Sequence, residues 1–261
     1  MVLGITFDTI FTNRHLVRAH GRSRAPLQII FPAGFRARTR TEVRAPAVLA
    51  SVMLPWLRAH CQPHPEFPSA HISSVYYDTS DWRLLNAKVA SDYFKRKVRL
   101  RWYQPIEGGP AAGPAFLETK LKEGARRDKV RVLLPEGAAS WAATELESVE
   151  FTAVLSHLQA QGIEEIGRLR PVFQIGYVRH RFVHPFTLAT LCLDSEIRVE
   201  RAHRLVFRQP RWTSLAAAVL EQKGPRDRLD PIFGELLRFG LRKTSFSKYL
   251  RCYAHLTGAV L

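Results

Sequence analysis

The sequence predicts an α+β fold with many antiparallel strands and few helices. Polar and apolar residues alternate in many segments of the 261-residue chain, at the two-residue period of a half-buried strand. Helical spacing is confined to a few stretches, and segments rich in Pro and Gly separate the elements. Hydrophobic residues make up 46% and charged residues 24%, as in a globular domain with a core. We therefore expect one α+β domain whose sheet could close into a barrel.

The expected elements follow one another in order along the chain. Alternation predicts strands at residues 35–44, 72–78, 94–103, 115–122, 129–134, 171–184, 187–195, 196–207 and 216–223. Helical spacing predicts helices at 46–60, 80–89 (a short helix or turn), 144–161, 232–241 and 246–256. Residues 216–223 are assigned as a strand from their context, since their alanines alone favour a helix. The glycines within 105–114 predict a hairpin loop.

Residues 1–34 differ from the rest of the chain. They are rich in arginine, and Asp8 is their only acidic residue. Transit peptides share this bias, although a clear amphipathic period is lacking. We expect a basic, disordered extension at 1–34, followed by the folded domain at 35–261.

The formal net charge of +16 indicates a polyanionic partner, such as nucleic acid, an acidic membrane surface, polyphosphate or a nucleotide. Cys61, Cys192 and Cys252 are too few and too scattered for a disulfide framework or a zinc site, which favours a reducing compartment. The longest apolar run, 45–57, contains two prolines and is too short to cross a bilayer. We therefore expect a cytoplasmic protein, and peripheral association with a membrane stays open.

The strand predicted at 94–103 has one basic and one apolar face. The basic face holds Lys95, Lys97, Arg99 and Arg101, and the apolar face holds Val98, Leu100 and Trp102. Four cations in a row repel one another unless an anion lies along them, and their N–H groups suit oxyanions. The row therefore predicts either a solvated surface or a site for a shared anion.

The same alternation recurs on other predicted strands. The charged faces hold Glu118, Lys120 and Lys122; Lys129 and Arg131; and Tyr177, Arg179 and Arg181. Any single strand could simply be half exposed to solvent. However, Arg and Lys predominate, and Glu42, Glu118 and Glu221 each precede a cation by two residues. A carboxylate beside a cation can hold a divalent metal that also binds phosphate oxygens, so a closed sheet with these faces inward would suit a triphosphate or polyphosphate.

Nucleic acid is disfavoured as the polyanion. Trp102 lies on the face opposite Arg99 and Arg101, where it cannot stack a base beside them, and Tyr177 is the one good exception. The sequence contains neither GxxxxGK[ST] nor GxGxxG, which excludes a P-loop and a dinucleotide fold.

Six blocks of sequence carry a family resemblance. They are residues 74–81 followed by Leu84, Leu85 and Lys88; residues 97–103; residues 116–120 with Lys129 and Arg131; residues 170–172 and 177–179 followed by 193–194; residues 220–223; and residues 245–249. Their order and spacing resemble the VTC domain, the polyphosphate polymerase domain of the vacuolar transporter chaperone complex. That family belongs to the triphosphate tunnel metalloenzymes, together with the CYTH phosphatases, and the resemblance covers residues 36–257.

The resemblance implies a closed antiparallel eight-stranded β-barrel with flanking helices, whose interior binds phosphates. Together with the strand patterns, it implies catalytic roles for Arg99, Arg101, Lys120 and Lys248. The residues expected to bind phosphate are Arg44, Lys129, Arg131, Tyr177, Arg179, Arg181, Lys223 and Ser247. Glu221 is the expected metal ligand, with Glu42 and Glu118 as further candidates, and Lys95 and Lys97 are expected at the tunnel mouth.

The first strand departs from the ExExK pattern of the CYTH phosphatases, because it contains Arg40, Glu42 and Arg44 at these positions. The missing carboxylate disfavours hydrolysis and fits polymerisation. The expected function is therefore ATP-dependent polyphosphate synthesis, with Mn²⁺ or Mg²⁺ as cofactor and with ATP and polyphosphate as partners. Two alternatives stay open: a triphosphate hydrolase of the CYTH type, and a non-catalytic protein that binds polyphosphate or nucleotide.

Overall fold

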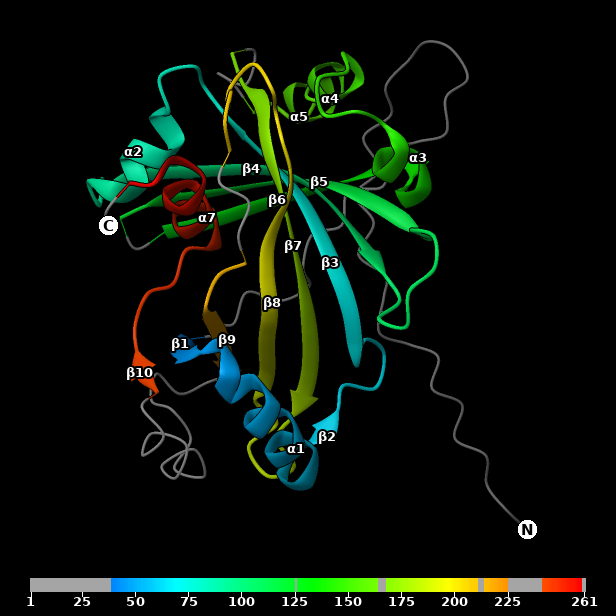
Figure 1. Cartoon of the computed structure of the whole chain (residues 1–261), viewed down its shortest axis with the longest axis vertical. Helices are drawn as coiled ribbons and strands as arrows, with labels where there is room; N and C mark the ends of the chain where they lie inside the picture. Colours follow the sequence, from blue (N-terminus) through cyan, green and yellow to red (C-terminus); the bar gives the residue numbers. More distant parts are fainter. Residues whose placement is uncertain (1–38, 125, 164–167, 211–213, 225–240, 260–261) are drawn as a thin grey trace.

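The computed structural model describes residues 39–124, 126–163, 168–210, 214–224 and 241–259. Within these ranges the protein has the predicted α+β fold, in which short helices pack on one large antiparallel sheet (Figure 1). The predicted extension at 1–34 lies outside the described residues. No helix in the described ranges is long and apolar enough to span a membrane.

The described part of the chain contributes ten strands to the sheet. They are β1 (Thr39–Pro46), β2 (Gln62–Pro63), β3 (Ser69–Asp78), β4 (Phe94–Gln104), β5 (Pro114–Glu123), β6 (Arg126–Gly137), β7 (Arg170–Val183), β8 (Thr190–Ala202), β9 (Ala217–Gly224) and β10 (Arg242–Lys243). Hydrogen-bonded neighbours follow the order β10-β1-β9-β8-β7-β3-β4-β5-β6, and β2 also pairs with β7. Because β2 and β10 are only two residues long, eight long strands remain among the described ones.

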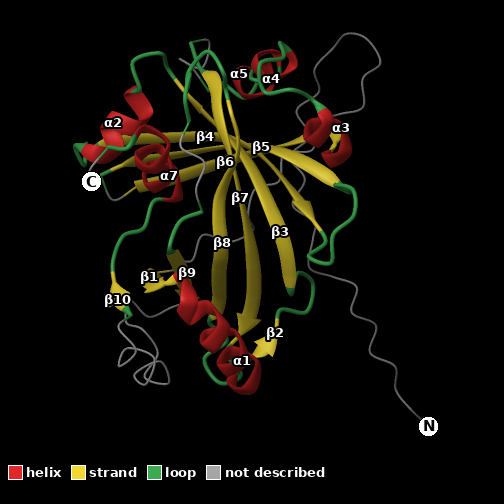
Figure 2. Cartoon of the chain, viewed as in Figure 1, coloured by secondary structure: helices red, strands yellow, loops and turns green. Residues whose placement is uncertain are grey.

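The sheet is strongly curved. In Figure 2, β3, β7 and β8 run side by side, whereas β4, β5 and β6 cross them at a steep angle. The hydrogen-bonded path has two ends, at β10 and β6, and no pairing that joins these ends is found among the described residues. Closure of the sheet into a barrel therefore stays a prediction.

The apolar faces of β4, β5 and β6 form a core on one side of the sheet. Val98, Leu100 and Trp102 on β4 are almost fully buried, as their alternation predicts. They belong to a cluster that also contains buried residues of α3 (Ala138–Ala143), α4 (Glu150–Ala153) and α5 (Ser156–Gln159). With these side chains covered by helices, the charged side chains of β4 must point to the opposite, concave side of the sheet.

Three further helices pack against the strands or bind their ends. After the short 3-10 helix η1 (Ala47–Leu49), α1 (Ala50–His60) buries Met53 and Leu57 against β8 and β9. Asp78, at the end of β3, accepts hydrogen bonds from the backbone N–H of Leu84 and Leu85 in α2 (Arg83–Val89). The Tyr249 hydroxyl of α7 (Lys248–Thr257) donates to the same carboxylate at 2.6 Å. Asp78 therefore caps α2, as Asp commonly does, and also anchors α7.

Three expected elements, one helix and two strands, differ from the structure. The helix predicted at 144–161 is absent as a single unit: α3 ends before Thr144, whose backbone is extended (ψ 131°), and α4 and α5 are separate single turns. The two strands predicted at 187–195 and 196–207 form the single strand β8. Glu196 has a positive φ of 52°, and the register of β7 with β8 shifts between Gly176 and Val178. The chain at Glu196 is therefore a bulge within one strand, and no break separates two strands there.

Most other elements are confirmed, including the alanine-rich strand β9. The strand predicted at 35–44 begins as β1 at Thr39, and residues 35–38 lie outside the described ranges. Residues 232–240 of the helix predicted at 232–241 also lie outside them.

Candidate functional site

The strand register brings the charged faces of β4, β5 and β6 together. Directly opposite side chains on antiparallel strands lie about 5 Å apart at Cβ, so like charges there destabilise the sheet unless other charges balance them. The opposed pairs across β4 and β5 are Lys95 with Lys122, Lys97 with Lys120, and Arg99 with Glu118. Those across β5 and β6 are Lys122 with Arg127, Lys120 with Lys129, and Glu118 with Arg131.

Glu118 lies at the centre of the deeper part of this surface. Its side chain is 3% exposed, and its oxygens lie 2.6 Å from Arg99 Nη2, 3.0 Å from Lys129 Nζ and 2.8 Å from Arg131 Nε. Arg101 Nη1 lies 3.9 Å away. Burial alone would raise the pKa of Glu118, but the four cations outweigh it and hold this pKa well below its ordinary value. The carboxylate is therefore ionised at neutral pH.

Hydroxyl groups orient two of these arginines further. Arg101 donates from Nε to Ser74 Oγ at 2.9 Å and from Nη2 to the Tyr177 hydroxyl at 3.1 Å. Arg131 donates from Nη2 to the Tyr103 hydroxyl at 2.8 Å, and its guanidinium lies 4.0 Å from the Phe116 ring centroid. The guanidinium groups are thus held in defined orientations, as bidentate recognition of phosphate requires.

A second buried carboxylate, Asp194 on β8, binds Arg179 on β7 and Lys248 at the start of α7. Arg179 donates from Nε and Nη2 to the two oxygens of Asp194, and Lys248 Nζ donates to Oδ2. Burial would raise the pKa of Asp194, yet the two cations outweigh it and hold this pKa well below its ordinary value. Lys248 Nζ also lies 4.6 Å from the Tyr177 ring centroid, which connects this group to Arg101 through Tyr177.

Two other carboxylates, Glu42 on β1 and Glu221 on β9, lie directly opposite each other. Glu221 is buried, with its oxygens 3.2 Å from Lys223 Nζ and 3.8 Å from Arg179 Nη2. A carboxylate oxygen of Glu42 accepts a hydrogen bond from the backbone N–H of Phe246 at 3.2 Å. Opposed residues project from the same face of a sheet, so this pair offers hard oxygen ligands to Mg²⁺ or Mn²⁺.

These residues fit a divalent metal only with help from a substrate. No group of three or more His, Cys, Asp or Glu side chains that could hold a metal occurs among the described residues. A metal at Glu42 and Glu221 would therefore take its remaining ligands from water or from phosphate oxygens, as Mg²⁺ does in phosphate-transferring enzymes.

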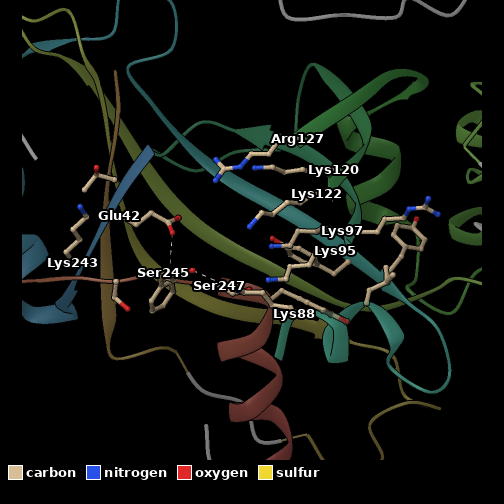
Figure 3. A pocket seen from close by; sticks show the side chains of 18 residues that line it. Glu42, Lys88, Lys95, Lys97, Lys120, Lys122, Arg127, Lys243, Ser245 and Ser247 are labelled. Atoms are coloured by element: carbon tan, nitrogen blue, oxygen red, sulfur yellow. Dashed lines mark hydrogen bonds between the residues drawn. The ribbon is translucent and has the colours of Figure 1, made fainter. Parts of the chain in front are cut away.

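A pocket of about 480 Å³ lies at the end of the charged surface where β4 and β5 meet α2 and the start of α7. Figure 3 shows the labelled lysine side chains of β4 and β5 directed toward the same space, with Lys88 and Lys243 on other sides of it. Eight of its eighteen described lining residues are Lys or Arg, and Glu42 is the acidic one. The basic ones are Lys88, Lys95, Arg96, Lys97, Lys120, Lys122, Arg127 and Lys243.

The structure brings most of the predicted site residues to one concave surface. Around Glu118 and Asp194 it gathers Arg99, Arg101, Lys129, Arg131, Tyr177, Arg179 and Lys248. Lys120 lines the pocket, and Lys223 contacts Glu221. Ser247 also lines the pocket, and its hydroxyl accepts from the Leu250 N–H as the N-cap of α7.

Two further predicted residues lie on the same strand faces as residues of the site. Arg44 is two positions from Glu42 on β1. Arg181 is two positions from Arg179 on β7, with its guanidinium 5.9 Å from the Tyr103 ring centroid. Arg44 is exposed on β1, opposite Val219 and Arg242. Arg181 is half-buried and donates from Nη1 to the carbonyl oxygen of Phe67 at 3.3 Å.

Sequence reasoning did not assign several residues of the site. Asp194 was visible as part of a family block, but its contact with Lys248 depends on how α7 packs. Lys88 was also part of a family block but was given no role, and Lys243 was not singled out; they line the pocket from a short helix and a two-residue strand, where no alternation marks them. Lys95 and Lys97, expected at a tunnel mouth, line the pocket itself.

The VTC domain family model matches residues 48–257 of the sequence. The chain therefore belongs to the VTC domain family. No curated protein matches it in sequence.

Solved structures show the same fold at low sequence identity. A proposed adenylyl cyclase from Hippeastrum with a dominant triphosphatase activity is 14% identical, with a TM-score of 0.53; the match covers 86% of this chain and 97% of that one. A proposed adenylate cyclase from Bacillus halodurans is 13% identical, with a TM-score of 0.49, and the match covers 80% of this chain and 93% of that one. The likeness to the Hippeastrum protein shows that the chain has a similar fold.

Proposed function

We propose that the protein is an ATP-dependent polyphosphate polymerase, which transfers the γ-phosphoryl group of ATP to the end of a polyphosphate chain. The main support is the continuity of the basic surface from the lysine pocket to the cations around Glu118, along one face of β4, β5 and β6. The row from Lys95 to Arg101 alone extends about 20 Å, at roughly 3.3 Å per residue of strand. A surface of this length suits a chain of phosphates.

The proposal includes closure of the sheet around this surface. The strong curvature of the sheet, visible in Figure 1, supports a tunnel. The charged side chains gathered on one face of β4, β5 and β6 support it as well. In such a tunnel, β6 and the β1 edge would lie close together and exclude bulk water. Interactions between charges are stronger in a site that excludes water, so enclosure would strengthen phosphate binding.

The reaction needs positioning and charge neutralisation more than proton transfer. A terminal oxygen of the acceptor chain attacks the γ-phosphorus of ATP, a new P–O bond forms, and the bond to the β–γ bridging oxygen breaks to release ADP. The attacking oxygen is already an anion, so no base has to remove a proton. Arg99, Arg101 and Arg131 would hold the transferred group, while Lys120 and Lys248 would neutralise charge on the flanking phosphates.

The charge states of the carboxylates fit this reaction. Glu118 and Asp194 both have pKa values well below the ordinary value, because burial, which would raise them, is outweighed by bound cations. A carboxylate held in this state is a weak general base and would activate water poorly. Glu42 and Glu221 would hold Mn²⁺ or Mg²⁺, which when bound neutralises phosphate charge.

Triphosphate hydrolysis is the second candidate. Glu42 and Glu221 support hydrolysis, because a metal ion bound by these two carboxylates could bind a water molecule as well as a phosphate. A non-catalytic binder is the third candidate, and it would need the cations but not the opposed carboxylates.

Phosphorus NMR would test the proposal. The purified protein is incubated with ATP and Mn²⁺, and growth of the mid-chain polyphosphate signal is the expected result. Orthophosphate as the only product would support the hydrolase, and triphosphate binding without turnover would overturn both enzymatic functions.

One lysine variant and one arginine variant, each with methionine in place of the charged residue, provide a matched comparison. Lys120→Met should lower turnover about 10²-fold, as expected for loss of a charge that stabilises the transition state. Arg126→Met is the control, since Arg126 is exposed on β6 and pairs with Asp128. Equal effects of both variants would contradict a specific role for the basic surface.

A further inference from the structure

Glu118 interacts with more charged groups than any other carboxylate of the site described above. Arg99 approaches Oε2 with both Nε (2.7 Å) and Nη2 (2.6 Å). Arg131 Nε approaches Oε1 at 2.8 Å, and Lys129 Nζ approaches the same oxygen at 3.0 Å. The carboxylate is 3% exposed, so these contacts are shielded from solvent.

These contacts fill the acceptor capacity of the carboxylate. Two oxygens offer about four lone-pair positions in total, and Arg99, Arg131 and Lys129 use four. A metal ion at Glu118 would have to displace at least one cation and would then lie beside the others. Repulsion between like charges makes that arrangement unfavourable.

The same contacts determine the orientation of two arginines. Arg99 turns its Nε and Nη2 edge toward Glu118. Arg131 uses Nε for Glu118 and Nη2 for the Tyr103 hydroxyl. Among the described residues, Nη1 of each guanidinium has no hydrogen-bond partner, so each keeps donors for a ligand on the concave side.

We propose that Glu118 is a positioning residue that holds Arg99 and Arg131 in the orientation in which they receive the transferred phosphoryl group. The inference rests on the proposed function, because it concerns the same phosphate-binding surface. Without the negative charge, four cations would face one another with no counter-ion, and they would separate until a phosphate arrived. They would then have to reorganise in each catalytic cycle, which preorganised sites avoid.

The test compares Glu118→Gln with Glu118→Asp. The glutamine variant keeps the size of the side chain but removes its charge, and we expect kcat to fall about 10²-fold. The dissociation constant for tripolyphosphate, measured by calorimetry without metal, should stay the same or decrease, because the site gains one positive charge. The aspartate variant keeps the charge on a shorter side chain and should recover part of kcat.

The metal requirement separates positioning from metal binding. The Mn²⁺ concentration that gives half-maximal turnover should be unchanged in both variants, and an increase in either one overturns the proposal. Unchanged kcat in folded Glu118→Gln also overturns it. If the glutamine variant does not fold, the aspartate variant decides: reduced kcat with unchanged metal requirement supports positioning, and unchanged kcat contradicts it.

A control variant and a binding measurement complete the test. Glu200→Gln removes a part-buried carboxylate that binds His71, Ser73 and Gln174, away from the basic surface, and it should leave kcat unchanged. If the unmodified protein binds tripolyphosphate but shows no turnover, the proposed function fails. The positioning role of Glu118 is then tested by tripolyphosphate binding alone. An equal or lower dissociation constant in Glu118→Gln supports this role, and a dissociation constant about ten times higher contradicts it.

Discussion

Asp194→Asn should destabilise the protein more than any exposed carboxylate substitution. Asp194 is fully buried, and the side chains of its two partners, Arg179 and Lys248, are only 11% and 14% exposed. The asparagine would remove the carboxylate that Lys248 binds and would leave Arg179 with only the more distant carboxylate of Glu221, at 3.8 Å. Breaking a buried ion pair from one side costs about 3–5 kcal/mol in the free energy of unfolding. We expect a loss of that size, because both oxygens of Asp194 accept hydrogen bonds from charged donors.

Urea unfolding at pH 7, without phosphate, measures this loss. Asp128→Asn is the matched control: Asp128 lies 3.0 Å from Arg126 Nε, and the two side chains are 45% and 73% exposed. An exposed pair of this kind contributes less than about 1 kcal/mol. If Asp194→Asn costs no more than the control, the buried cluster does not stabilise the fold and the reasoning is refuted.

The pH dependence gives a second measure. Although burial acts in the opposite direction, Arg179 and Lys248 hold the pKa of Asp194 below its ordinary value of 3.8. The unfolded chain therefore takes up a proton at higher pH than the folded one. The stabilisation is complete well above pH 3.8 and is lost as the pH falls below it. The difference in unfolding free energy between wild type and Asp194→Asn should accordingly narrow in acid, and a constant difference down to pH 2 would contradict this assignment.

Three further predictions concern other residues. Gly176→Ala should cost about 1–3 kcal/mol in urea unfolding, because a Cβ there would overlap the hydrogen-bonded carboxylate of Glu200, and a change below 0.5 kcal/mol would contradict this. Tyr177→Phe removes the hydroxyl that accepts from Arg101 and should weaken tripolyphosphate binding in calorimetry, whereas unaltered affinity would exclude this role. Glu221→Gln should raise the Mn²⁺ concentration needed for half-maximal turnover. If that concentration does not change, Glu221 is not a metal ligand.

The alternation of residues predicted β4 well, because this strand has one buried apolar face and one charged face. Val98, Leu100 and Trp102 are buried and thereby turn Arg99 and Arg101 to the concave side. The prediction was wrong at β8, where two successive strands were expected and the structure has one continuous strand with a bulge at Glu196.

The ionic contacts of the site were much harder to predict than its strands. Glu118 was visible as a carboxylate two residues before a lysine, which suggested a metal ligand. Its actual neighbours, Arg99 and Arg131, come from the strands on either side and meet it only through the register. Register is a long-range property of the sheet, so the pattern of a single strand does not reveal it. The lysine pocket was also hard to predict, because its residues come from β4, β5, α2 and β10 and no local pattern links these elements.

The anchoring of α7 has a consequence for the order of folding. Two successive residues of α7 bind different parts of the sheet: Lys248 reaches Asp194 on β8, and Tyr249 reaches Asp78 at the end of β3. Both contacts join residues far apart in sequence, and α7 follows every long strand in the chain. During synthesis the strands can therefore emerge and pair before Asp194 receives its lysine. The buried ion pair between Lys248 and Asp194 should then form late, once α7 has docked on the sheet.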